Sequence, residues 1–184
     1  MLRHERVSMV AAVQRGVDGD PYGVTLAGVI RQLFVALEQR PLVKAFMLRD
    51  REVIGKLLRQ AGVSESKVLS RATLVTYLEV LHARGLVRTD LSVSAQVNLI
   101  MATITGFLLA EPVLLDDRQG MVEDPADVVA DVIGRALDPG RRLTAAEQRV
   151  VEQATREYVE QVVALSDAKY QSSLAVCTPA RRRR

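Results

Sequence analysis

The chain has 184 residues, of which 48% are hydrophobic and 26% charged, and its formal net charge is +3 at pH 7. These proportions are typical of a soluble globular protein that has one core and at most a small appended element. Its single cysteine, Cys177, excludes an intrachain disulfide and a cysteine-based zinc site. The arginine run at 181–184 supplies the positive excess and is typical of a solvated tail.

No long segment alternates apolar and polar residues with a period of two, so the sequence predicts an all-α protein. Polar residues follow Met1 almost directly, which predicts no signal peptide. The apolar run Val97–Ala110 is shorter than the roughly 20 residues that a membrane-spanning helix needs. We therefore expect a cytoplasmic protein with no membrane-bound part.

Caps, prolines and apolar spacing predict the helices in chain order. Thr25 is expected to cap a helix that Pro41 ends, and Gly85 is expected to close another in the left-handed conformation. Asp124 followed by Pro125 is a strong helix start, and Thr144 with Glu147 forms a capping box. The predicted helices cover roughly residues 2–17, 26–40, 41–48, 51–61, 64–84, 94–109, 125–137 and 144–170. Residues 111–124 are expected to form an acidic loop.

The helix at 94–109 is apolar nearly all round, which predicts burial on nearly all sides. The helix at 125–137 carries valine, isoleucine and leucine along one side. Together they have more apolar surface than one subunit of this size can cover, and Gly106 allows close helix approach. The two helices are therefore expected to lie in a dimer interface.

Several phrases of the sequence fall in the order and spacing of one family: Leu26–Leu37, Arg40–Val43, Asp50–Leu58, Ala83–Leu91 and Val128–Pro139. Residues 1–139 thereby resemble the effector-binding and dimerisation domain of TetR-family transcriptional regulators. The resemblance implies a TetR-like C-terminal helical bundle that dimerises through a four-helix bundle. It does not cover 140–170, expected to form an appended C-terminal helix, or 171–184, expected to form a flexible basic tail.

Members of that family begin with a helix-turn-helix whose second helix enters the DNA major groove. The usual N-terminal helix-turn-helix is not found within this sequence: either it precedes Met1 in the full gene product, or the protein works without DNA. The chain is therefore expected to be the small-molecule-binding and dimerisation part of a ligand-responsive regulator. Operator DNA would be bound only through a head that this chain does not contain.

In such domains the effector pocket lies among the middle helices, where it would take a mainly apolar small molecule held by a few polar groups. The candidate ligand-binding residues are Phe46, Met47, Thr73, Tyr77, Asn98, Met101, Thr105 and Phe107. For each of them the alternative is a core side chain with a satisfied hydrogen bond. The candidate dimer-interface residues are Val97, Ile100, Ile104, Leu108, Val129, Val132, Ile133 and Ala136.

Two other functions compete with this one. Gly62 to Ser64 and Arg84 to Arg88 mimic the turn and the wing of a winged-helix DNA-binding protein using residues 55–90. The spacing between them is too long, however, and no β-wing sequence follows. The second is a helical interaction protein without DNA binding. The chain has no phosphate-binding glycine loop, nucleophile elbow or zinc-protease motif, so no enzyme activity, cofactor or metal is expected.

Overall fold

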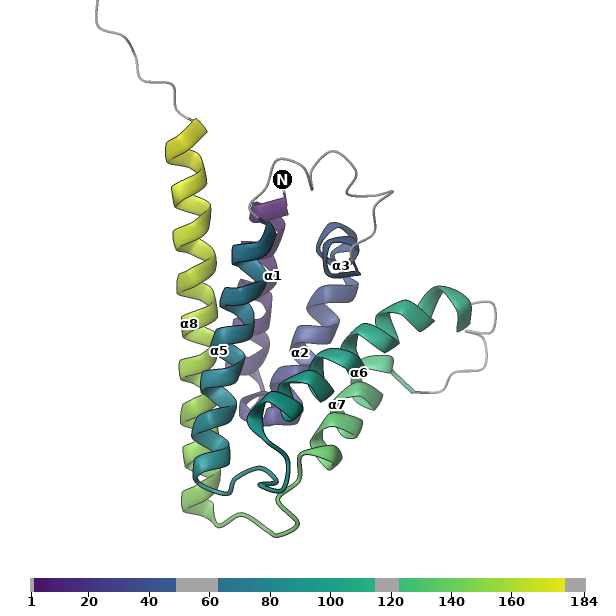
Figure 1. The fold of residues 1–184 in the computed structure, drawn as a ribbon, viewed down its shortest axis with the longest axis vertical. Helices are drawn as coiled ribbons and strands as arrows, with labels where there is room; N and C mark the ends of the chain where they lie inside the picture. The colour runs from purple at the N-terminus through teal and green to yellow at the C-terminus, as the bar shows by residue number, and fades with distance from the viewer. Residues whose placement is uncertain (1, 49–62, 115–122, 178–184) are drawn as a thin grey trace, which may run out of the picture.

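The structure of the chain is a computed structural model that describes residues 2–48, 63–114 and 123–177, and the side chains of 4–45, 71–110 and 123–172 (Figure 1). Within these ranges every regular element is a helix, which confirms the all-α class. The elements are α1 (Leu2–Gly19), the 3₁₀ helix η1 (Pro21–Val24), α2 (Leu26–Glu38), α3 (Pro41–Leu48), α5 (Val63–Ala83), α6 (Val93–Leu114), α7 (Pro125–Ala136) and α8 (Ala145–Cys177).

The predicted helix starts are formed as expected. The hydroxyl of Thr25 accepts a hydrogen bond from the backbone N–H of Gly28 at 2.9 Å, at the start of α2. Asp124 accepts one from the N–H of Ala126, also at 2.9 Å, ahead of α7. Each cap satisfies a backbone donor that the first helical turn would otherwise leave without a partner.

Two helices are longer than predicted. Helix α6 continues through Pro112 to Leu114, where a loop was expected from residue 111. A proline in the last turn removes only one hydrogen bond close to the helix end, so the helix tolerates it there. Helix α8 runs to Cys177 rather than to 170, so the expected flexible tail begins as helix. The predicted helix at 51–61 and the arginine run at 181–184 lie outside the described residues.

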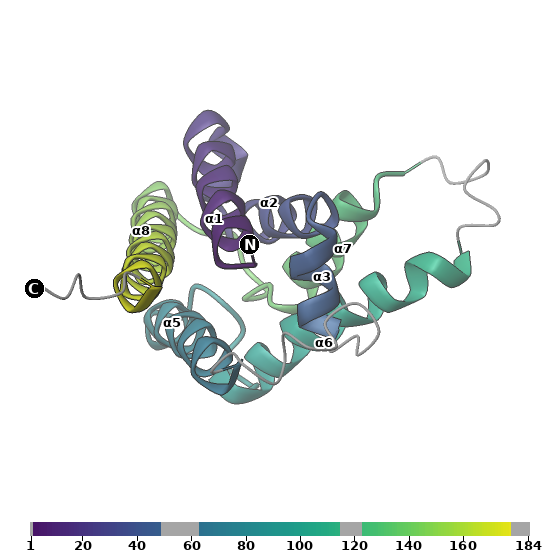
Figure 2. The same cartoon turned by 90° about the horizontal axis from the view of Figure 1, so that it is seen from above.

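Helices α1, α5 and α8 run side by side along the long axis of the molecule (Figures 1 and 2). Helix α8 packs against both α1 and α5, while α2 packs against α1 and α7. Ala154, Thr155 and Val159 of α8 are buried. Helix α8 therefore covers one side of the bundle that α1 and α5 help to form.

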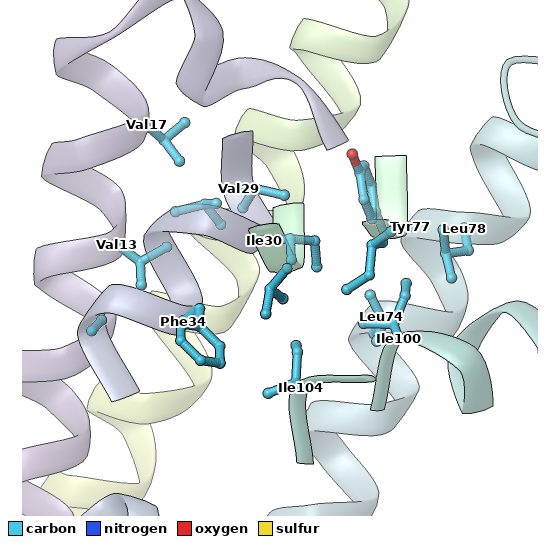
Figure 3. Packing of buried hydrophobic residues seen from close by; sticks show 14 of the residues in the cluster. Val13, Val17, Val29, Ile30, Phe34, Leu74, Tyr77, Leu78, Ile100 and Ile104 are labelled. Carbon is cyan, nitrogen blue, oxygen red and sulfur yellow. The ribbon is translucent and has the colours of Figure 1, made fainter. Parts of the chain in front are cut away.

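The hydrophobic core lies where α1, α2, α5 and α6 meet. Side chains from all four helices point toward one another there (Figure 3). Val17, Phe34, Leu78 and Ile104 are each at most 1% exposed. Full burial of such a side chain contributes roughly 1.5–3 kcal/mol relative to exposure, so these contacts dominate the packing of the bundle.

The corner between α1 and α2 is unusually tight. A Cβ added at Gly28 would lie 2.0 Å from the carbonyl oxygen of Tyr22 in η1. Only a residue without a side chain fits this close backbone approach. The glycine therefore sets how closely η1 folds back on α2.

Candidate functional site

The predicted effector residues on α5 belong to the core of the bundle. The Tyr77 hydroxyl lies 2.8 Å from the Thr155 hydroxyl of α8, and its ring stacks on Tyr158 with centroids 4.9 Å apart. Burial raises the pKa of the Tyr77 phenol far above its ordinary value. Thr73, one helical turn earlier, is also buried. Tyr77 thus joins α5 to α8 instead of facing α3 and α6.

The predicted effector residues on α6 point in different directions. Asn98 is exposed, Met101 is 38% exposed, and Thr105 is half-buried. Phe107 instead meets Phe34 of α2 edge to face, with ring centroids 6.4 Å apart. These side chains therefore do not surround a common space.

The two remaining candidates, Phe46 and Met47, have side chains outside the described set. The amide oxygen of Asn98 accepts a hydrogen bond from the Arg71 guanidinium at 3.0 Å, across the surface between α5 and α6. Of the six predicted ligand-binding residues whose side chains are described, only Tyr77 lines either of the hollows described below.

Most of the predicted dimer-interface residues face the interior of the single chain. Six of the eight are at most 1% exposed: Val97, Ile100, Ile104, Leu108, Val129 and Ile133. Ala136 is half-buried, and Val132 is 42% exposed. These six side chains pack in the core of the single chain, and their place in a dimer interface stays a prediction.

The exposed face of α6 is apolar and weakly polar, whereas α7 exposes Asp127, Asp131 and Arg135 beside Val132. The outer face of α6 consists of Ser94, Asn98, Met101, Ala102, Gly106 and Leu109. Leu109 is 55% exposed, more than any other large hydrophobic side chain in the described part of the chain. No charged residue occurs from Leu91 to Ala110. In the single chain α6 is therefore buried along one side, and burial on its other side stays a prediction.

Part of α6 is also long and apolar enough to cross a membrane. Residues Val93–Ala110 have a mean hydropathy of 1.6, and 28% of them are buried within the fold. The buried residues recur along one side and pack in the core. One such helix is weak evidence for a membrane span, because a core helix of a soluble protein has the same composition.

A shallow groove of about 230 Å³ lies between α5 and α8, and we call it the α5–α8 groove. It is lined by Val80, Arg84, Arg149, Val150, Gln153, Ala154 and Glu157. A smaller hollow of about 30 Å³ shares three of these residues and continues past Thr76, Tyr77, Tyr158 and Gln161. Nothing in the spacing of α5 shows that α8 lies beside it, so the sequence alone did not predict this groove.

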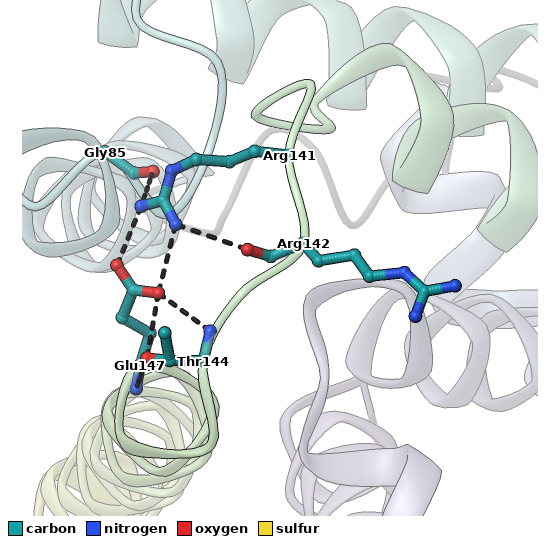
Figure 4. Close-up of polar contacts among 5 residues, drawn as sticks. All are labelled: Gly85, Arg141, Arg142, Thr144 and Glu147. Carbon is teal, nitrogen blue, oxygen red and sulfur yellow. Dashed lines mark hydrogen bonds and ion pairs between the residues drawn. The ribbon is translucent and has the colours of Figure 1, made fainter.

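A polar cluster lies at the start of α8 (Figure 4). Arg141 donates hydrogen bonds to the carbonyl of Gly85 at 3.2 Å and to the carboxylate of Glu147 at 2.8 Å. The same carboxylate accepts from the backbone N–H of Thr144 at 2.8 Å, which confirms the predicted capping box. The cluster fastens the start of α8 to the turn that follows α5.

A second set of contacts joins that turn to α6 and α7. The Arg88 guanidinium donates to the carbonyl of Ala136 at 3.1 Å, and its backbone N–H donates to the carbonyl of Leu137 at 3.0 Å. The buried Gln96 amide donates to the carbonyls of Arg88 and Leu91, at 2.8 and 3.0 Å. The turn between α5 and α6 therefore contacts the C-terminal end of α7 and the first turn of α6.

Within the described ranges, no group of three or more histidine, cysteine, aspartate or glutamate side chains is placed to hold a metal ion. The comparisons with known proteins give no further guidance. No protein-family model matches the sequence, no curated protein is similar to it, and no solved structure matches its fold.

Proposed function

We propose that this chain is the dimerising, small-molecule-binding part of a TetR-like, ligand-responsive transcriptional regulator in the cytoplasm. The order of the sequence phrases and the all-helical fold support this proposal. The effector is a mainly apolar small molecule, and operator DNA is contacted by a head outside this chain. The protein is a regulator and not an enzyme.

The exposed faces of α6 and α7 carry the proposal. Three apolar side chains are exposed to solvent in the single chain: Met101 (38%) and Leu109 (55%) on α6, and Val132 (42%) on α7. Exposed apolar side chains on two helices that pack together are a feature of interaction surfaces. Helices α6 and α7 pack against each other. A second copy related by twofold symmetry would complete a four-helix bundle and cover these side chains.

The winged-helix alternative needs β-strands for its wing, after α5. Residues 84–92 are all described, and they form turns and bends with no strand before α6 begins. The other alternative, a helical interaction protein without DNA binding, differs in its response to small molecules. A regulator of the proposed kind gains thermal stability from its effector, because the ligand binds only the folded state.

The oligomeric state tests the proposed interface. We expect multi-angle light scattering to show a dimer for the chain, and a folded monomer for Met101→Glu and for Leu109→Glu. A charge placed in a buried apolar interface without a partner is expensive. The matched control is Val80→Glu, because Val80 is also 38% exposed but lies on α5. It should leave the dimer intact.

A wild-type monomer at micromolar concentration would contradict the dimer, as would a dimer unaffected by both α6 variants. Ile104→Glu would not be informative, because Ile104 lies in the core of the single chain and its replacement would unfold the protein. A thermal-shift screen of mainly apolar metabolites tests the ligand-responsive part. The absence of any stabilising compound would favour the interaction-protein alternative.

A further inference from the structure

We propose that the α5–α8 groove binds a small amphipathic monocarboxylate. The carboxylate would sit at Arg84 and Arg149, and the apolar body would cover Val80 and Val150. This site differs from the effector pocket expected among the middle helices, and the proposal does not depend on the proposed function.

The side chains along the groove change from basic at one end to apolar in the middle. Arg84 and Arg149 line only the larger hollow, at the end near the turn that follows α5. Val80 and Ala154 line both hollows, so they lie in the middle. The groove therefore has a basic end and an apolar floor.

The two guanidinium groups at the basic end have no partner among the described residues. Neither Arg84 nor Arg149 forms a hydrogen bond or an ion pair with any residue in the described part of the chain. In contrast, Arg141 is held by Glu147 nearby. A guanidinium group binds a carboxylate through two parallel hydrogen bonds, which is the strongest common pairing for either group. Two such groups beside one hollow favour an anionic ligand.

The floor of the groove is apolar, being formed by Val80, Val150 and Ala154. Val80 is 38% exposed, although it lies beside two packed helices. A hydrocarbon chain or an aromatic ring placed on Val80, Val150 and Ala154 would remove this surface from water, which is favourable in proportion to the area covered. A simple inorganic anion would leave the floor exposed.

The size and the far end of the groove limit the ligand. Its volume of about 230 Å³ is below the roughly 300–1,000 Å³ of sites for drug-sized molecules. Glu157 borders both hollows, and its carboxylate accepts a hydrogen bond from Gln153 at 2.8 Å. A second acid group on the ligand would meet this like charge. The geometry thus points to a monocarboxylate with a short aliphatic chain or one aromatic ring.

Hexanoate and phenylacetate are the probes, and hexanol and 2-phenylethanol are their neutral counterparts. Titrations followed by amide NMR shifts should show changes confined to residues 76–84 and 149–161. At constant ionic strength, Arg84→Gln and Arg149→Gln should each weaken hexanoate binding about tenfold. Binding of hexanol should change little. Both arginines are exposed, so the variants are expected to fold.

The matched control is Arg15→Gln, which removes an exposed arginine from α1 and should leave hexanoate binding unchanged. The proposal is overturned if neither acid shifts the groove amides, or if the double variant at Arg84 and Arg149 binds hexanoate as tightly as the wild type. Leu109→Glu should still bind hexanoate. An experiment that contradicts the dimer is therefore distinguishable from one that contradicts the groove site.

Discussion

At the scale of single residues, the ends of the helices are set by a few polar side chains. Thr144 and Glu147 satisfy each other's backbone N–H groups at the start of α8. Arg141 adds two hydrogen bonds to the same carboxylate and also contacts Gly85. Gly85 itself has a φ of +62°, a conformation that favours glycine. These contacts fix the turns between α5, α7 and α8.

The Glu147 carboxylate makes this cluster sensitive to acid. The Arg141 guanidinium, with the backbone and hydroxyl of Thr144, lowers the pKa of Glu147 from 4.5 to about 2. A depressed pKa in the folded state stabilises the protein above the ordinary pKa of the group, and this stability is lost as the pH falls toward 2. The charged form of Glu147 therefore stabilises the fold at neutral pH.

We predict that Glu147→Gln is less stable than the wild type near neutral pH, and that the difference shrinks between pH about 4.5 and about 2. Urea unfolding at a series of pH values measures it. Glu160→Gln is the matched control, because its carboxylate is exposed on the same helix and contacts no arginine in the described residues. A stability difference for Glu147→Gln that stays constant over this range would contradict the prediction.

At the scale of helices, α8 is joined to α5 by both aromatic and polar contacts. Tyr77 is 3% exposed and Thr155 is 0% exposed, so their hydroxyl pair is shielded from water. A buried hydroxyl that loses its partner costs roughly 1–3 kcal/mol. The 20.3 kDa chain therefore depends on α8 for part of its core, and this helix is not a dispensable addition.

We predict that Tyr77→Phe and Thr155→Val each destabilise the protein by about 1–2 kcal/mol, because each leaves the other hydroxyl of the pair buried without a hydrogen-bond partner. The double variant should cost less than the sum, since the two groups are coupled. Urea unfolding of all four proteins gives the coupling energy. Tyr158→Phe is the control, as it keeps the ring stack and removes a hydroxyl outside this pair. Additive effects would show that the pair contributes nothing.

At the scale of the whole molecule, the uncharged outer face of α6 is the feature that a single chain leaves incomplete. Only 28% of residues 93–110 of α6 are buried inside the single chain. In Figure 1, α6 and α7 lie away from α8, on the other side of the bundle. A partner could cover them there without disturbing the α5–α8 groove.

We predict that the melting temperature rises with protein concentration, since unfolding a dimer releases two chains. A hundredfold increase in concentration is worth about 2.7 kcal/mol per dimer, which corresponds to a few degrees. Differential scanning calorimetry at micromolar and at hundredfold higher concentration measures the shift. The Leu109→Glu variant should melt at a temperature independent of concentration. The same independence in the wild type would refute the dimer.

The sequence determined the local structure of this protein. Thr25, Asp124 and the pair Thr144 and Glu147 begin helices where they were expected to, and Gly85 ends the turn after α5 as expected. These features depend on hydrogen bonds and backbone conformations within a few residues. Such interactions are readable without knowing the rest of the fold.

The tertiary structure decided which faces are covered. Helix α6 has apolar side chains all round, so its spacing could not show that Ile104 faces the core while Leu109 faces water. Tyr77 was expected to face an effector, but α8 lies beside it and takes its hydroxyl. The groove at Arg84 and Arg149 exists because α5 and α8 pack together, although these two arginines are 65 residues apart in the sequence. Contacts between distant segments depend on the arrangement of the whole bundle, and no local pattern encodes them.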